Sequence, residues 1–514
     1  MEKTVSRKIS YERVIWEIKR ALYSFRRSPA PALMLLQLPV LAFVYSKGSG
    51  PIYMDMLGIL AFITFLSWFF VSVIHGNRQI LIYTLILLSV GTMLQCIFIK
   101  EAILKNPDTY SEKALTTSLQ LQYAAGFAAA IAASFIYYKW SGIASMNMCR
   151  ILFLISSGIS LLTLALGAGV GGVRNWIRIG GLSIQTTELT KLMYIFLAAG
   201  LLGTVDLPSG KRLRAFYLVS IVQSAFLALQ GEFGTLLLII LVFFAFLFLF
   251  VPDTSLFIKT VAAFAGCILC GGFALWQLEH LAKTHARLAG NRLIMAGLSA
   301  YSKLANRFIY WKHPEKDPLG LGYQLLKARE SIMLGGWFGT ASVTDLPVKT
   351  SDLVYPALIQ RCGMIFALLV FFIFVLLWLE GMRLFVRKSD RFHQMVAAGI
   401  VIMLFVQTII IIAGSTGLCP LTGITLPFIS KGGSSLLISF VMTGILITIS
   451  GNVSWKGTSH EETEEFFKES PVFTKLRSDF GHFGHAVADP YLRFVSRCFK
   501  RSRPGKGEGE TKDV

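Results

Sequence analysis

Long apolar stretches separated by short polar segments run along most of the 514-residue chain. Each stretch holds about 20 residues, enough for a helix to cross a lipid bilayer. Because backbone groups inside a bilayer must bond within their own segment, the pattern predicts an all-α polytopic membrane protein with about 12 transmembrane helices. Several stretches contain Gly or polar residues, so we expect one or two to be tilted or re-entrant. The predicted spans are residues 31–46, 53–74, 80–99, 120–138, 150–170, 189–205, 214–230, 235–251, 255–278, 353–379, 394–413 and 435–451.

The composition agrees with this class of protein. Hydrophobic residues make up 54% of the chain and Asp, Glu, Lys and Arg only 15%, whereas a soluble domain carries about 25% charged residues. The formal net charge is +20. In a membrane protein such an excess is explained by basic residues at the cytoplasmic leaflet, so we expect no nucleic acid partner. The seven cysteines are scattered and mostly lie in apolar stretches, which argues against a disulfide framework.

The basic residues between the spans predict the orientation, because they gather at the even-numbered connections. Both termini are therefore expected in the cytoplasm, and residues 280–352 form a large extracytoplasmic loop. This loop holds ten Lys or Arg against five Asp or Glu, which suits an anionic substrate such as a pyrophosphate. Residues 1–29 predict a cytoplasmic amphipathic segment, 30–118 the N-terminal transmembrane helices, and 452–514 a cytoplasmic tail with a disordered end.

Four polar stretches on the predicted outer face have a more specific sequence than a simple connection between two membrane spans needs. They are GVRNWIRIGGLSIQTTELTKL (172–192), QGEFGT (230–235), DPLGLGYQLLKARESIMLGGWFGTASVTDLPVKTSDLVY (317–355) and GLCPLTGITLPFISKGGSSLL (417–437). Their order and spacing resemble the SEDS family of cell-wall proteins, which includes RodA, FtsW and SpoVE. The last stretch meets the family pattern GLxPxTGxxLPFxSxGGSS throughout. The resemblance runs over 119–451, which we interpret as the SEDS-like transmembrane core. Counted over the whole chain, about twelve spans correspond to the usual ten of the family and two extra N-terminal ones.

The resemblance implies an activity. SEDS proteins are peptidoglycan glycosyltransferases that polymerise lipid II into glycan strands on the outer face of the bacterial cytoplasmic membrane, for cell elongation or division. Undecaprenyl pyrophosphate leaves with inversion at the sugar carbon. The family partner is a class B penicillin-binding protein, a transpeptidase, and this chain contains no transpeptidase signature of its own. Asp352 matches the aspartate that is essential in the family.

Several family positions are changed in this chain. The Glu and His of LPExHTD are Val348 and Thr350, and the acidic pair that usually follows is Gln360 and Arg361. The remaining changes are Thr186 for Pro, Glu232 for Asp and Lys431 for an aromatic residue. The chain is therefore identified as a divergent member.

Asp352 is the candidate catalytic residue. The acceptor hydroxyl is a poor nucleophile near neutral pH, so a carboxylate should take its proton or hold a divalent cation such as Mg or Mn. The sequence establishes no cofactor. Asp352 directly precedes the predicted span 353–379, and an ionisable residue at a membrane boundary indicates function. The structural alternative is that Thr350, Ser351 and Asp352 cap a helix.

The substrate-binding candidates each have a structural alternative. Arg guanidinium groups match phosphate oxygens and Trp stacks on sugars, although both also anchor membrane edges. Glu188 and Lys191 face the cavity or simply pair with each other, and Glu232 supports the site or caps the next span. Ser434 and Ser435 start a helix that suits phosphate or close packing. The candidates are Arg174, Trp176, Arg178, Glu188, Lys191, Glu232, Tyr323, Gln324, Ser434 and Ser435, of which Tyr323 and Gln324 come from the GYQ match.

Two other functions fit the same pattern. A flippase for lipid-linked precursors would also have about a dozen spans and a basic cavity, but it predicts charged residues deep within the spans. The changed residues at 348 and 350 leave a non-catalytic scaffold that activates a partner synthase as the second alternative.

Overall fold

The computed structural model describes residues 37, 40–46, 48–73, 76–139, 145–170, 173–179, 182–203, 210–251, 253–284, 292–340, 345–387 and 391–451. The predicted amphipathic segment 1–29, the tail 452–514 and half of the first predicted span, 31–46, lie outside these residues. The chain divides into two compact units, one of residues 1–246 and 265–453 and one of residues 247–264 and 454–514. The candidate site lies entirely in the first unit.

Within the described residues, ten helices are long and apolar enough to cross a membrane. This confirms a helical multi-pass membrane protein, while the count of twelve stays a prediction. Helix α7 (Thr186–Gly203) corresponds to the predicted span 189–205 but is not among the ten, because Glu188, Lys191 and several threonines lower the hydropathy of its first two turns. The ten are α3 (Gly50–Val73), α4 (Arg78–Lys105), α5 (Glu112–Lys139), α6 (Met146–Leu166), α8 (Gly210–Gln230), α9 (Phe233–Phe250), α10 (Thr254–Thr284), α15 (Met364–Arg387), α16 (Arg391–Thr416) and α17 (Gly433–Gly451).

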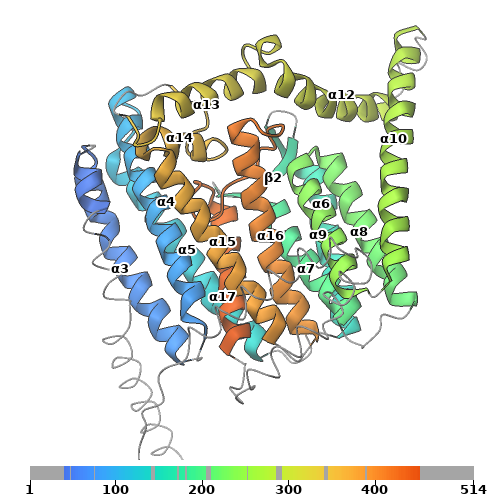
Figure 1. Cartoon of the computed structure of the whole chain (residues 1–514), viewed down its shortest axis with the longest axis horizontal. Helices are drawn as coiled ribbons and strands as arrows, with labels where there is room; N and C mark the ends of the chain where they lie inside the picture. Colours follow the sequence, from blue (N-terminus) through green and yellow to red (C-terminus); the bar gives the residue numbers. More distant parts are fainter. Residues whose placement is uncertain are drawn as a thin grey trace, which may run out of the picture. The chain divides into compact units, whose positions relative to one another are not determined.

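The helices α4, α16 and α17 form the centre of the larger unit, since most of their residues are buried. Helix α17 lies along α5, where Gly444 meets the backbone of Ala130 and Gly126 meets the ring of Phe440. Small residues allow this close approach of two membrane helices. Helix α16 packs between α15 and α7 (Figure 1). The loops at the ends of these central helices are therefore anchored to buried, closely packed elements.

The predicted span 353–379 is not one helix. It is divided at Gly363 into a short buried helix, α14 (Val354–Cys362), and the long helix α15. Gly363 has φ 87, a left-handed conformation that glycine adopts without strain. The freed N–H groups of Met364 and Ile365 donate to the carbonyl oxygens of Gly336 and Trp337, at 2.9 and 3.3 Å. Asp352 thus precedes a short helix rather than a membrane span.

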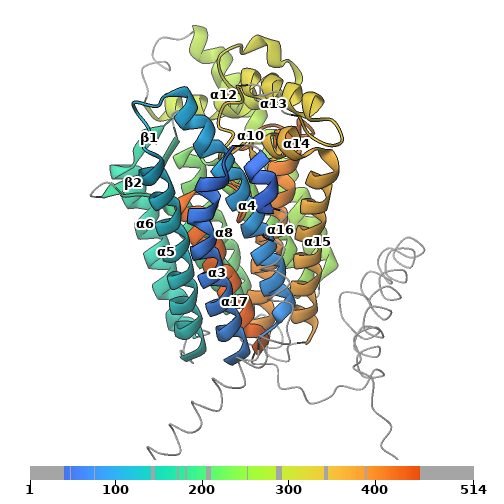
Figure 2. The same cartoon turned by 90° about the vertical axis from the view of Figure 1, so that its left-hand side faces the viewer.

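The predicted loop 280–352 is largely helical. It contains α12 (Arg292–Lys312), the 3-10 turn η2 (Pro314–Lys316) and α13 (Leu321–Gly335). Figures 1 and 2 show α12 and α13 lying across the end of the bundle at which α14 and the β-strands are also found. The motif stretches therefore reach the same end of the molecule.

A small antiparallel sheet, which the all-α prediction did not include, begins just before the 172–192 stretch and continues into it. Its strands are β1 (Ala168–Val170), β2 (Val173–Ile179) and β3 (Leu182–Gln185), in the order β1-β2-β3. In β2 and β3, Trp176 pairs with Gln185 and Arg178 with Ser183. In VRNWIRI, Val173, Ile177 and Ile179 fall at odd positions and Arg174 and Arg178 at even ones, which fits the two-residue period of a strand. The sheet leads directly into α7.

Candidate active site

Asp352 lies in a tight turn, residues 346–353, which we call the Asp352 turn. The N–H groups of Ser351 and Leu353 both donate to the carbonyl oxygen of Val348, at 3.0 and 3.3 Å. Leu346 and Leu353 are buried at its two ends. The N-cap position of α14 is Leu353, and no side chain caps it. The alternative in which the Asp352 side chain caps a helix is therefore not supported by this geometry.

A second loop, residues 417–432 between α16 and α17, lies against the Asp352 turn. The N–H of Lys431 donates to the carbonyl oxygen of Thr350 at 2.7 Å, and the Ser430 hydroxyl donates to the carbonyl oxygen of Ser351 at 2.7 Å. Gly423 faces the carboxylate, because a Cβ at this position would stand 3.8 Å from Oδ2 of Asp352. The third and fourth motif stretches are thus joined at Asp352.

Helix α12 covers the 417–432 loop with two side chains one helical turn apart. Arg307 Nη1 donates to the carbonyl oxygen of Leu421 at 2.6 Å, and Trp311 Nε1 donates to that of Gly417 at 2.9 Å. Residues at i and i+4 share one face of a helix. The contacts place the Arg307 guanidinium beside the loop that faces Asp352.

The charge of Arg307 acts on two carboxylates, those of Asp352 and Glu232. Burial raises the pKa of the Asp352 carboxyl above its ordinary value of 3.8, while a hydrogen bond from Ser351 and the charge of Arg307 oppose the rise. A carboxyl whose pKa is raised in this way is a better proton acceptor near neutral pH than an exposed one. Arg307 therefore belongs to the candidate site, although the sequence analysis counted it only as one of ten basic loop residues.

Glu232 is buried in the short connection between α8 and α9. Burial and the nearby charge of Glu188 raise the pKa of its carboxyl to about 7, against the opposing effects of Lys191, Thr235 and Arg307. The Thr235 hydroxyl donates to Glu232 Oε2 at 3.4 Å. This carboxyl can hold a proton or release it close to neutral pH.

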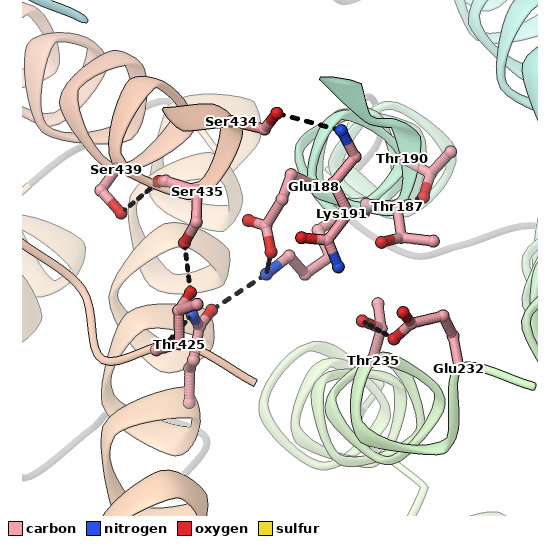
Figure 3. A network of polar contacts seen from close by, with 12 residues as sticks. Thr187, Glu188, Thr190, Lys191, Glu232, Thr235, Thr425, Ser434, Ser435 and Ser439 are labelled. Carbon is pink, nitrogen blue, oxygen red and sulfur yellow. Dashed lines mark hydrogen bonds and ion pairs between the residues drawn. The ribbon is translucent and has the colours of Figure 1, made fainter. Parts of the chain in front are cut away.

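Glu188 and Lys191 begin a polar network between α7, α16 and α17 (Figure 3). Lys191 Nζ is 2.8 Å from Glu188 Oε1 and 3.1 Å from Gln407 Oε1, and the Gln407 amide donates to the carbonyl oxygen of Thr425 at 2.7 Å. The Thr425 and Ser435 hydroxyls are 2.6 Å apart. The pairing of Glu188 with Lys191, one of the two sequence interpretations, is therefore present in the structure.

Ser434 and Ser435 both use their hydroxyls within the protein. Ser434 Oγ accepts a hydrogen bond from the N–H of Gln185 at 3.0 Å, and Ser435 contacts Thr425. The packing interpretation of these serines fits the contacts, and phosphate binding by them stays a prediction. Figure 3 shows Glu232 and Thr235, at the start of α9, facing Thr187 and Lys191 on α7.

Other candidates lie outside this network. Trp176 is half-buried and Arg178 is exposed in β2, two residues apart and so on one face of the strand. Arg174 is in β2 opposite Gly169, but its side chain is outside the described part of the structure. Tyr323 and Gln324 lie in the first turn of α13, where their N–H groups bond to Asp317 and Gly320. No side-chain contact described here joins Tyr323 or Gln324 to Asp352.

The described residues do not form a protein cage for a metal. They include no group of three or more His, Cys, Asp or Glu side chains that could hold an ion. The charged neighbour of Asp352 is a cation, Arg307, which disfavours a second cation at the same carboxylate. Among the described residues, Asp352 therefore lies beside a cation of the protein rather than in a group of metal ligands.

Comparison with known proteins finds the same family that the four motif stretches resemble. A family model for the cell cycle proteins FtsW, RodA and SpoVE matches residues 78–454. Stage V sporulation protein E of Bacillus subtilis (strain 168) is 31% identical over 328 residues, covering 61% of this chain and 80% of its own. A probable peptidoglycan glycosyltransferase FtsW of Coxiella burnetii (strain RSA 493 / Nine Mile phase I) is 30% identical over 313 residues, covering 58% of this chain and 77% of its own.

The fold is also similar to a solved structure. A chain in the structure of a peptidoglycan synthase complex that coordinates polymerization and crosslinking has a TM-score of 0.53 and 18% identity, over 74% of this chain and 99% of that chain. The family match begins at Arg78, the first residue of α4, and therefore includes α4 and all later helices. With the fold, the four motif stretches and the family model in agreement, the chain belongs to the FtsW/RodA/SpoVE family.

Proposed function

We propose that this protein is a peptidoglycan glycosyltransferase that polymerises lipid II on the outer face of the bacterial cytoplasmic membrane. Membership of the family and relatives named as peptidoglycan glycosyltransferases support the reaction. The single observation that carries the proposal is the meeting of Asp352, Arg307 and Gly423, from three separate segments, at one end of the bundle.

In the proposed reaction, Asp352 is the general base. The acceptor sugar's 4-hydroxyl oxygen attacks the anomeric carbon of the donor, its proton passes to the Asp352 carboxylate, and the bond from the anomeric carbon to the pyrophosphate oxygen breaks. A single displacement inverts the configuration, so one base is sufficient. Because the pKa of Asp352 is raised, it lies closer to the working pH, and the carboxylate is a stronger base toward the acceptor hydroxyl.

Cations at the same end would stabilise the leaving pyrophosphate. Arg307 lies near the carboxylates of Asp352 and Glu232. Arg174 and Arg178 of strand β2 are further candidates for binding the donor phosphates.

The decisive experiment is the Asp352→Asn substitution, assayed by glycan chain formation from lipid II with the purified protein. The change keeps the size of the side chain and removes its charge. If Asp352 takes the acceptor proton, chain formation should fall by about 10²–10⁴-fold while the protein still folds and inserts. A folded Asp352→Asn protein with near-normal chain formation would remove Asp352 from the mechanism. Addition of a chelator to the wild-type assay tests separately whether a divalent cation is needed.

We propose that both termini are cytoplasmic and that α12 and α13 are extracytoplasmic, as the basic residues indicate. Reporter fusions after Lys312 and after Arg387 should report opposite sides of the membrane, and the same side for both would contradict the orientation. The proposed partner is a class B penicillin-binding protein, because a solved relative in fold belongs to a synthase complex. Chain formation should therefore be measured with and without this partner, which also tests whether the protein acts only as a scaffold.

A further inference from the structure

We infer that Glu101 of α4 is a positioning residue that holds the Asp352 turn in its working geometry; the inference rests on the proposed function. The Glu101 carboxylate accepts hydrogen bonds from two cations, Lys349 and Arg361. The three side chains are 17%, 18% and 6% exposed, respectively. Lys349 is three residues before Asp352 and Arg361 is nine residues after it. One carboxylate therefore holds both sides of the segment that carries Asp352.

The rest of α4 contacts the same turn. Gln95 Nε2 donates to the carbonyl oxygens of Thr350 and Ile429, at 3.3 and 3.1 Å. Lys349 Nζ lies 5.6 Å from the ring centroid of Phe98. Residues 95, 98 and 101 are three apart and so lie along one side of the helix. Each residue of this line of Gln95, Phe98 and Glu101, which we call the α4 stripe, contacts Lys349 or Thr350 of the Asp352 turn.

Charge explains why Glu101 is needed. Lys349 and Arg361 are both largely buried, and two buried cations close together repel unless an anion lies between them. Without Glu101 the turn would move toward solvent to separate and hydrate them. Lys349 would then draw Asp352 away from the substrate, and a displacement of about 1 Å is enough to slow catalysis about a hundredfold.

The same contacts account for one of the four changed positions in this part of the motif, Arg361. Val348, Thr350, Gln360 and Arg361 stand where the family pattern has acidic residues and a histidine. In this chain cations on the turn and on α14 meet an acid that comes from α4 instead. Glu101 thus supplies, from another helix, a negative charge beside the turn, where the family pattern has an acidic residue at position 348.

The test compares Glu101→Gln with Asp345→Asn. The control removes the Lys105–Asp345 pair, which also joins α4 to the start of the same segment at 2.6 Å but is 54% and 77% exposed. We expect Glu101→Gln to lower kcat for lipid II polymerisation by about tenfold to a hundredfold, with KM changed less than about twofold. Hydrogen exchange across 346–353 should become faster. Asp345→Asn should match the wild type in both measurements, because an exposed pair contributes little.

A charge exchange separates positioning from general stability. Glu101→Lys should lose activity because it places a third cation beside Lys349 and Arg361. Adding Arg361→Glu should restore part of kcat, because the new acid pairs with the introduced lysine and returns the cluster to two cations and one anion. Normal kcat and normal exchange in folded Glu101→Gln would overturn the inference. If Glu101→Gln cannot be recovered folded, an inactive but folded double variant would overturn it. If wild-type protein makes no glycan, the proposed function fails, and hydrogen exchange alone decides: acceleration in Glu101→Gln but not in Asp345→Asn supports positioning, and equal exchange contradicts it.

Discussion

The guanidinium of Arg307 donates a 2.6 Å hydrogen bond to the carbonyl oxygen of Leu421, and through it α12 is joined to the loop that faces Asp352. The same guanidinium neighbours the carboxyls of Asp352 and Glu232. Arg307 thus combines two roles, because its hydrogen bond orders the loop and its charge favours the ionised form of both acids.

Arg307→Lys and Arg307→Ala should separate these roles. Lysine keeps the charge but cannot reproduce the planar fork of donors, so turnover should fall about tenfold or more with the pH profile unchanged. Alanine also removes the charge that lowers the pKa of Asp352. The acidic limb of the rate profile should then move to higher pH, because Asp352 stays protonated longer. Polymerisation rates from about pH 5 to about pH 9 would test this, and identical profiles for both variants would contradict it.

Glu232 should make stability depend on pH. Its pKa is about 7 in the folded protein against an ordinary value of 4.5, so the folded state binds the proton more tightly than the unfolded state. The free energy of unfolding should therefore fall by about 3 kcal/mol as pH rises from about 4.5 to about 7. Glu232→Gln should remove this slope in detergent-solubilised protein. Glu330→Gln, at a side chain that is 45% exposed, is the control that should keep it.

The buried pair of Glu188 and Lys191 should couple strongly. Their side chains are 7% and 1% exposed at an Oε1–Nζ distance of 2.8 Å. Glu188→Gln alone leaves a buried ammonium group without its anion, which typically costs about 3–5 kcal/mol of stability. The double variant Glu188→Gln/Lys191→Met should cost clearly less than the sum of the two single changes. Unfolding measurements on all four proteins complete the cycle, and simple additivity would show that the pair is not coupled.

Val348 should be strained in the Asp352 turn. Its φ is 44, and the left-handed region costs an L-residue with a Cβ about 1–2 kcal/mol. The side chain is 43% exposed, so little packing is lost by shortening it. Val348→Gly should raise the free energy of unfolding by about 0.5–1 kcal/mol after the added chain entropy of glycine is subtracted. Val348→Ala keeps the Cβ, and an equal gain from alanine would place the cause elsewhere.

Hydropathy predicted most of the membrane helices, because a bilayer demands long apolar segments and the chain supplies them. The division of 353–379 into α14 and α15 was missed, since Gly363 is a single glycine in an apolar run and its positive φ leaves no trace in hydropathy. The helical nature of 292–312 was missed because mixed basic and apolar residues were interpreted as a loop. The spacing of Arg307 and Trp311, four residues apart, was a usable indication of a helix in this segment.

Some parts of the candidate site could not have been predicted from one sequence. Glu101 meets Lys349 and Arg361 across 248 and 260 residues of chain, and no local pattern records such pairing. Asp352, by contrast, was found through its motif. Its neighbours depend on how loops from distant helices pack together.

The bonds that hold the Asp352 turn have a consequence for how the sequence can change. The acceptors are peptide oxygens: Thr350 receives Gln95 and Lys431, and Ser351 receives Ser430. A peptide oxygen is present whichever amino acid occupies the position. Mutations at 350 and 351 can therefore accumulate over evolutionary time without breaking these bonds. At these two positions the shape of the turn is therefore inherited through the main chain.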